Sequence, residues 1–279
     1  MALFKTRLFS GKQESLSKPH PFSDLPLILA SGLGRSGTTV LRHCLAAHSR
    51  SASQNEECNY IHDLIRAADT NLDNKNHLKT LPVSQDSYWQ LHRQLLLNLY
   101  WPVDQLENMD QPRAISTYSM LDPRAAIGLK KAFPNLVVCY IIRNGIEVVS
   151  SYQSFPAFKH LEFEAVCQLW ALRHDMFKYQ AHQRHFFLFR FEWFQQPDLF
   201  QNQLEAALKF AGLEFEPRCM EPLKTKFHPT TFAGESPNAA KEMTARRDRW
   251  TLWNDQQRDL FATICGPAMK SLGYEILWQ

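Results

Sequence analysis

The sequence predicts a three-layer α/β fold in which a central, mostly parallel sheet is flanked by helices. Short apolar runs, of which Leu136–Ile142 is the strongest, have the near-continuous hydrophobicity of strands that are buried on both faces of a parallel sheet. These runs alternate with amphipathic stretches of helical period, such as residues 162–183. With 279 residues, of which 44% are hydrophobic, the chain is long enough to bury a large core in one domain.

Residues 1–25 are expected to be a flexible lead-in, and residues 26–279 a single domain. The N-terminal segment has no apolar stretch of signal-peptide length, and no later run approaches the roughly 18 apolar residues of a membrane span. The six cysteines form no C-x-x-C pair, which favours reduced thiols over a zinc site or disulfides. We therefore expect a cytoplasmic protein. Its net charge of +3 gives no reason to expect a nucleic-acid partner.

The first predicted strand, residues 27–30, leads into a glycine-rich turn and the start of a helix. The turn and the first helical residues combine glycine, a cation and hydroxyl groups: Gly32, Gly34, Arg35, Ser36, Gly37, Thr38 and Thr39. Free N–H groups at a helix start, together with the helix dipole, favour a bound phosphate or sulfate. The guanidinium of Arg35 adds a planar cation to these donors. The sequence therefore predicts an anion-binding loop.

The spacing of Gly32 and Gly37 is that of the nucleotide-binding P-loop, but Thr38 occupies the position where that motif has lysine. The lysine serves the β- and γ-phosphates of a triphosphate, so its absence argues against an ATPase, a GTPase or a kinase. A P-loop nucleotide kinase is kept as a second alternative function.

The helix after the loop extends to about His48, which is interpreted as a helix-terminal or core histidine. A short strand at 51–54 delivers Glu56 and Glu57, which are expected to open a helix through about residue 68. Carboxylates in a first turn are often only partners of the helix dipole. These two, however, lie at the predicted carboxyl edge of the sheet, where open α/β folds bind ligands.

Residues 70–112 are predicted to be a helical insertion or cap. Residues 71–86 have no regular pattern, whereas the helix at 84–100 is apolar over a wide arc, which favours core packing over an acceptor pocket. A strand at 113–119 and a proline-initiated helix at 123–133 follow.

The central strand at 136–142 ends in Arg143, and Ser151 follows eight residues later, after the start of another helix. A cation at the carboxyl end of a strand and a hydroxyl in the next helix can bind a second anion from two sides. Two anion motifs at strand-to-helix junctions suit a nucleotide with phosphates at both ends of its ribose. After them come a helix at 162–183, a strand at 185–191, a helix at 199–211, a possible lid loop at 221–245 and a closing helix at 256–271.

Both motifs resemble those of sulfotransferases that use 3′-phosphoadenosine 5′-phosphosulfate (PAPS). Gly-x-x-Arg-Ser-Gly-Thr-Thr is similar to the 5′-phosphosulfate loop of the branch with arginine in the loop, which includes tyrosylprotein and many bacterial sulfotransferases. Arginine followed by serine eight residues later is similar to the family's 3′-phosphate motif. The resemblance implies a P-loop-like fold, PAPS as co-substrate, no metal, and sulfuryl transfer to a hydroxyl group of an acceptor. The sequence identifies neither the class of the acceptor nor the oligomeric state of the protein.

The resemblance also implies roles for individual residues. Glu57 matches the acceptor-activating base, with Glu56 as the alternative, and Arg249 belongs to an Arg-Trp pair near the 3′-phosphate. The 5′-phosphosulfate ligands implied are Arg35, Ser36, Gly37, Thr38 and Thr39, with Arg35 also catalytic, and the 3′-phosphate ligands are Arg143 and Ser151. Many members carry a further lysine, absent from residues 115–119, which Arg35 or Arg113 would have to replace. Without a replacement, the alternative is a non-catalytic module that binds adenosine bisphosphate.

Overall fold

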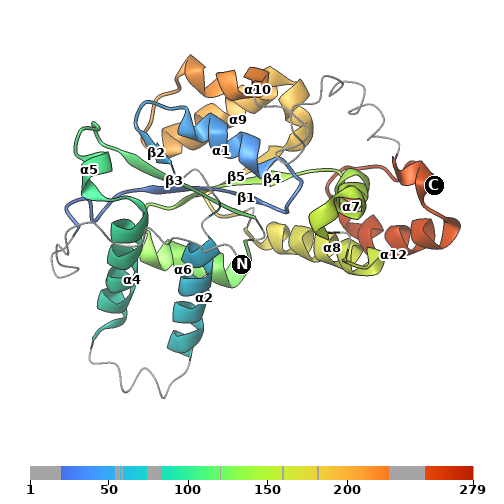
Figure 1. The fold of residues 1–279 in the computed structure, drawn as a ribbon, viewed down its shortest axis with the longest axis horizontal. Helices are drawn as coiled ribbons and strands as arrows, with labels where there is room; N and C mark the ends of the chain where they lie inside the picture. The colour runs from blue at the N-terminus through green and yellow to red at the C-terminus, as the bar shows by residue number, and fades with distance from the viewer. Residues whose placement is uncertain are drawn as a thin grey trace, which may run out of the picture.

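The computed structural model describes most of the chain, namely residues 20–53, 57, 59–73, 83–119, 121–158, 160–180, 182–225 and 249–278. Its centre is a five-stranded parallel sheet with strand order β2-β3-β1-β4-β5 (Figure 1). The strands are β1 Leu27–Gly32, β2 Ser51–Ser53, β3 Arg113–Ser119, β4 Val137–Ile142 and β5 Phe186–Arg190. Gly32 is level with Ser119 on β3 and with Ile141 on β4, so the carboxyl ends of the three middle strands meet at one edge.

Helices cover both faces of the sheet, which confirms the predicted three-layer α/β architecture (Figure 1). One face carries α1 Thr38–Ala46, α9 Pro197–Phe210, the turn η3 Pro217–Met220 and α10 Glu221–Thr225. The other face carries α2 Asn59–Asp73, α4 Gln85–Tyr100, α5 Val103–Leu106, α6 Pro123–Ala132, α7 Gly145–Ser154, α8 Phe163–Gln180 and α12 Asp255–Ser271. Three short 3₁₀ turns complete the described elements: η1 Pro156–Phe158, η2 Phe191–Gln195 and η4 Arg249–Leu252.

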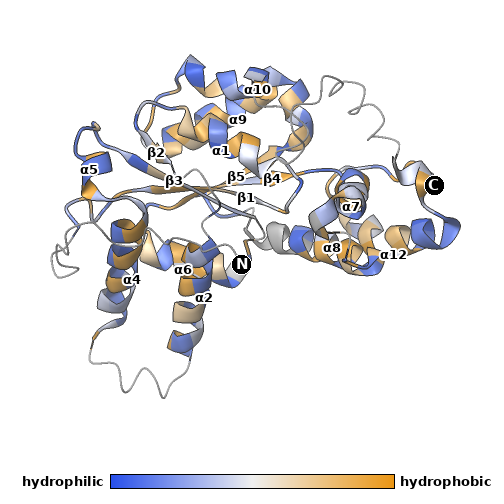
Figure 2. Ribbon diagram, in the orientation of Figure 1, coloured by the Kyte–Doolittle hydropathy of each residue, from blue (hydrophilic) through white to orange (hydrophobic). Residues whose placement is uncertain are grey.

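Strands β1 and β4, in the middle of the sheet, are largely apolar on both faces because each face packs against its own helical layer (Figure 2). On β1, Leu27 and Leu29 point to the layer of α2, α6 and α8, whereas Ile28 and Ala30 point to that of α1 and α9. All six residues of β4 are buried. This burial fixes the sheet register, and with it the place where each strand ends.

Helix α4 is part of the larger core, as its wide apolar arc predicts. Trp89, Leu96 and Leu97 are buried, and the Tyr88 hydroxyl donates a hydrogen bond to the carbonyl of Ala68 on α2. These aromatic side chains therefore pack helices together. The end of the lead-in joins the same layer, because His20 is buried and its Nε2 lies 3.0 Å from the carbonyl oxygen of Trp101.

Helix α2 begins later than the sequence predicts, at Asn59, so Glu57 precedes the helix. The helix is held on α6 by close packing and by charge. A Cβ on Gly128 would lie 2.7 Å from Cγ2 of Ile65, which means that only glycine permits this approach. At the start of α6, Oδ2 of Asp122 lies 3.2 Å from Nε2 of the buried His62.

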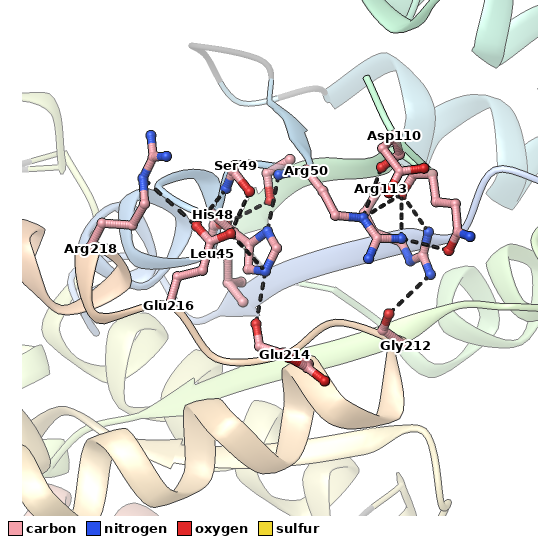
Figure 3. Close-up of polar contacts among 12 residues, drawn as sticks. Leu45, His48, Ser49, Arg50, Asp110, Arg113, Gly212, Glu214, Glu216 and Arg218 are labelled. Carbon is pink, nitrogen blue, oxygen red and sulfur yellow. Dashed lines mark hydrogen bonds and ion pairs between the residues drawn. The ribbon is translucent and has the colours of Figure 1, made fainter. Parts of the chain in front are cut away.

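His48 is a structural residue at the amino edge of the sheet (Figure 3). The side chain is buried; Nε2 lies 2.9 Å from the carbonyl oxygen of Glu214, and Nδ1 accepts a hydrogen bond from the backbone N–H of Arg50. Next to it, both the backbone and the hydroxyl of Ser49 donate to Glu216. The interpretation of His48 as a helix-terminal or core histidine is confirmed.

Five cysteines lie in the described part of the chain, Cys44, Cys139, Cys167, Cys219 and Cys265, and all five are buried free thiols, as predicted. Among the described residues, no helix combines the length and the apolar character needed to cross a membrane.

Candidate active site

The loop between β1 and α1 has a backbone that tolerates few side chains. A Cβ on Gly32 would overlap the carbonyl oxygen of Ile141, and one on Gly37 would lie 2.8 Å from Phe194 and 2.9 Å from Phe191. Gly37 has a φ of 97°, and Arg35, although not glycine, has a φ of 70°. Left-handed backbone at a non-glycine residue is costly and concentrates at functional sites. The loop is thus a tightly packed, strained turn built around Arg35.

Helix α1 starts at Thr38 without a side-chain cap. Gly37 is its N-cap residue, and the first turn contains no acidic side chain, so the first N–H groups of the helix have neither an intrahelical partner nor a capping oxygen. The N–H of Ser36 donates to the carbonyl of Leu33 at 3.1 Å, while its fully buried hydroxyl has no hydrogen-bond partner among the described residues. Backbone donors, a buried hydroxyl and positive helix-dipole potential therefore meet at one place, which is where an anion is stabilised.

Arg35 extends from this loop to helix α7. Its Nε donates a hydrogen bond of 3.1 Å to Oγ of Ser151, and its guanidinium carbon lies 4.3 Å from the centre of the Phe155 ring. The sequence places these residues more than a hundred positions apart. The structure brings the arginine of the first motif into contact with the serine of the second.

Arg143, at the end of β4, reaches the same loop from the other side. Its Nη1 donates to the carbonyl oxygen of Arg35 at 3.0 Å, and its Nε donates to Glu147 at 2.8 Å. The guanidinium also stacks on Phe191, with 3.8 Å from its carbon to the ring centre. Arg35, Arg143 and Ser151 thus form one connected cluster at the carboxyl edge of β1 and β4.

The segment directly after β5 also contributes to this cluster, which we did not predict from its sequence. Glu192 accepts hydrogen bonds from the backbone N–H of Asn144, at 3.1 Å, and from the hydroxyl of Tyr274, at 3.0 Å. Asn144 in turn caps α7, since its Oδ1 accepts from the N–H of Ile146. Glu192 therefore fixes the start of the helix that carries Ser151. The signal in the sequence was an acid between aromatic residues directly after a strand.

Glu57 lies near the loop, on the side of α2. Burial raises the pKa of Tyr152 to about 12, while the charge of Arg35 lowers this pKa and that of Glu57 raises it. The hydroxyl of Tyr152 lies next to Gly34, where a Cβ would come within 2.8 Å of it. The pKa of Tyr118 on β3 is also raised, chiefly by burial, and Glu57 again contributes. An exposed carboxylate thus acts on two hydroxyl groups, of which that of Tyr152 borders the loop.

Two other expected site residues cannot be located completely. Glu56 lies outside the described residues. The backbone of Arg249 belongs to η4, which packs on α7, but its side chain lies outside the described part of the structure. Arg113 cannot take the place of a lysine at the loop, because it opens β3 at the opposite edge of the sheet. There its guanidinium donates to backbone carbonyls, including that of Ala211 at 2.6 Å and that of Gly212, which Figure 3 shows.

A profile of the sulfotransferase family matches residues 26–217, which include the loop, Glu57, Arg143 and Ser151. The chain belongs to this family. No curated protein sequence matches the chain. The family assignment confirms the resemblance and agrees with the three-layer fold.

Solved sulfotransferase structures share this fold. The sulfotransferase domain from the curacin biosynthetic pathway is 15% identical, with a TM-score of 0.56 over 90% of this chain and 98% of that one. The sulfotransferase domain of the Synechococcus PCC 7002 olefin synthase is 15% identical, with a TM-score of 0.50 over 90% and 94% of the two chains. Mouse sulfotransferase SULT7A1, solved in complex with PAP, is 11% identical, with a TM-score of 0.50 over 89% and 84%.

Proposed function

We propose that this sulfotransferase-family protein transfers the sulfuryl group of PAPS to a hydroxyl group of an acceptor. The observation that carries the proposal is the contact between the two anion motifs. Arg143 donates to the backbone of Arg35, and Arg35 donates to Ser151, so donors for two separate phosphates lie side by side at one sheet edge. A nucleotide with phosphates at its 3′ and 5′ positions matches this arrangement, and Thr38 occupies the position where a triphosphate-binding loop has lysine.

The loop offers hydrogen-bond donors that suit the 5′-phosphosulfate. The uncapped N–H groups at the start of α1 and the buried, unpartnered hydroxyl of Ser36 provide donors without competing acids in the first turn. Gly37, Thr38 and Thr39 would bind the group through these N–H groups, and Arg35 would add its charge. Arg143 and Ser151 would bind the 3′-phosphate, and Arg249 is assigned the same role from the sequence alone.

The chemistry is an in-line transfer. The acceptor oxygen forms a bond to sulfur while the bond between sulfur and the bridging phosphate oxygen breaks, and the electron pair stays on the 5′-phosphate of the departing adenosine 3′,5′-bisphosphate. Glu57 takes the proton of the acceptor hydroxyl. Arg35 and the α1 N–H groups stabilise the negative charge that develops on the phosphate, where fixed donors act strongly. These steps use residues of the chain alone.

Two measurements test the proposal in sequence. Calorimetry should show micromolar binding of adenosine 3′,5′-bisphosphate, and incubation with ³⁵S-labelled PAPS and a panel of phenols, sugars, alcohols and tyrosine peptides should yield a labelled product. Arg35→Ala and Glu57→Gln should each abolish that product while the fold survives. Binding without any labelled product would favour the non-catalytic module, and magnesium-dependent ATP hydrolysis would favour a kinase.

A further inference from the structure

Arg173 on α8 is a half-buried arginine with few partners. Its Nη1 donates one long hydrogen bond, of 3.4 Å, to the carbonyl oxygen of Leu121, and its buried Nε has no hydrogen-bond partner. Among the described residues, no carboxylate forms an ion pair with it. A guanidinium has five N–H donors, and a buried donor without an acceptor costs free energy. Such a residue favours an anionic ligand that the free protein does not supply.

Two other arginines show that an unpartnered Nε is not decisive by itself. Nε is also buried and without a partner in Arg93 and Arg258. Each of these side chains nevertheless has a carboxylate within ion-pair distance: Asp24 at 3.7 Å from Arg93, and Asp255 at 3.4 Å from Arg258. Arg173 differs because its positive charge has no such counterpart in the described part of the chain.

The position of Arg173 follows from the sheet order. One turn earlier on α8, the indole N–H of Trp170 donates to the carbonyl of Arg143, at the end of β4, at 3.3 Å. Arg173 itself contacts Leu121, just after β3. Because β1 lies between β3 and β4, helix α8 passes beneath the carboxyl end of β1, where the loop begins. Arg173 therefore lies on the α8 side of the loop.

Arg173 faces the same polar region as Glu57. Its charge lowers the pKa values of Tyr118 and Tyr152, which burial otherwise raises, and Glu57 acts on the same two hydroxyl groups. The hydroxyl of Tyr152 lies against Gly34 in the loop. Arg173 and Glu57 therefore both act electrostatically on a hydroxyl group that lies against the loop.

We infer that Arg173 binds the sulfuryl group of the donor, on the face that the loop leaves uncovered. This inference rests on the proposed function, because it takes the ligand of the loop to be PAPS. It adds a residue from a helix that neither anion motif includes. A guanidinium here contacts the sulfuryl oxygens while the bond to phosphate breaks, and it does not contact the bisphosphate product.

The distinction between donor and product supplies the test. PAPS and adenosine 3′,5′-bisphosphate differ by the sulfuryl group, so calorimetric titration of both compares a ligand that has the contact with one that lacks it. Losing a hydrogen-bonded charge contact should weaken PAPS binding by about tenfold in Arg173→Gln. Bisphosphate binding should stay within about twofold of the unsubstituted protein. Arg93→Gln is the matched control and should change neither affinity.

Each other result has a definite meaning. If the unsubstituted protein binds neither ligand, the proposed function fails, and the inference with it. If that protein binds both, but Arg173→Gln changes neither affinity or weakens both equally, the assignment of Arg173 is wrong while the proposed function stands. Should Arg173→Gln fail to fold, Arg173→Met keeps the apolar stem, and the same two titrations apply to it.

Discussion

The conformation of the loop between β1 and α1 depends on Gly37, and replacing this residue by alanine tests that dependence. A left-handed backbone costs a non-glycine residue about 1–2 kcal/mol. The new methyl group would also lie 2.8 Å from Phe194 and 2.9 Å from Phe191, and overpacking of this kind costs about 1–3 kcal/mol. Gly37→Ala should therefore lower the free energy of unfolding by about 2–5 kcal/mol.

Gly273→Ala separates the two contributions. Gly273 has a similarly positive φ of 74°, but a Cβ there would meet nothing within 4 Å, so only the backbone cost of about 1–2 kcal/mol applies. Urea unfolding measures both variants, and calorimetry measures adenosine 3′,5′-bisphosphate binding. Binding should weaken at least tenfold, about 1.4 kcal/mol, in Gly37→Ala alone. Equal unfolding free energies and equal affinities in the two variants would refute the reasoning.

Three further substitutions separate binding, catalysis and folding. Glu57→Gln should abolish sulfate transfer from labelled PAPS while bisphosphate binding stays within about twofold, and unchanged transfer would exclude Glu57 as the base. His48→Ala should reduce the free energy of unfolding, measured in urea, by about 1–3 kcal/mol without weakening nucleotide binding. A selective loss of nucleotide binding would contradict the structural role of His48. Asp122→Asn should lower the free energy of unfolding by about 2 kcal/mol at neutral pH. Burial raises the pKa of Asp122, but the hydrogen bond to His62 and other contacts lower the pKa from 3.8 to about 2. Because this pKa is depressed, the difference from the unsubstituted protein should shrink as the pH falls from about 4 toward 2, and a constant difference would contradict the assignment.

The sheet could be predicted from the sequence because a buried parallel strand has an unambiguous composition. Every residue of Leu136–Ile142 is apolar, and the run is too short for a typical helix. The loop was predictable for a related reason, since glycines at fixed spacing before a helix have few structural uses. The start of α2 was predicted wrongly: Glu57 precedes the helix, and the first helical residue is Asn59.

Contacts between distant segments could not be predicted, because spacing along the chain does not specify them. The hydrogen bond from Arg35 to Ser151 and the one from Tyr274 to Glu192 exist only once α7, β5 and the C-terminal segment are packed. Arg173 is a single basic residue within an amphipathic helix, and its sequence context is that of any solvated cation. Its position beneath the loop depends on the strand order, which helix and strand patterns leave open.

The central claim is that the cluster of Arg35, Arg143 and Ser151 binds a nucleotide with phosphates at both its 3′ and 5′ positions. The most direct measurement is calorimetric titration of the full chain with adenosine 3′,5′-bisphosphate, with AMP and with magnesium-ATP. We predict micromolar binding of the bisphosphate, at least tenfold weaker binding of AMP because the 3′-phosphate contacts of Arg143 and Ser151 are lost, and weaker binding still of ATP. Equal affinity for AMP and the bisphosphate, or a preference for magnesium-ATP, would contradict the account.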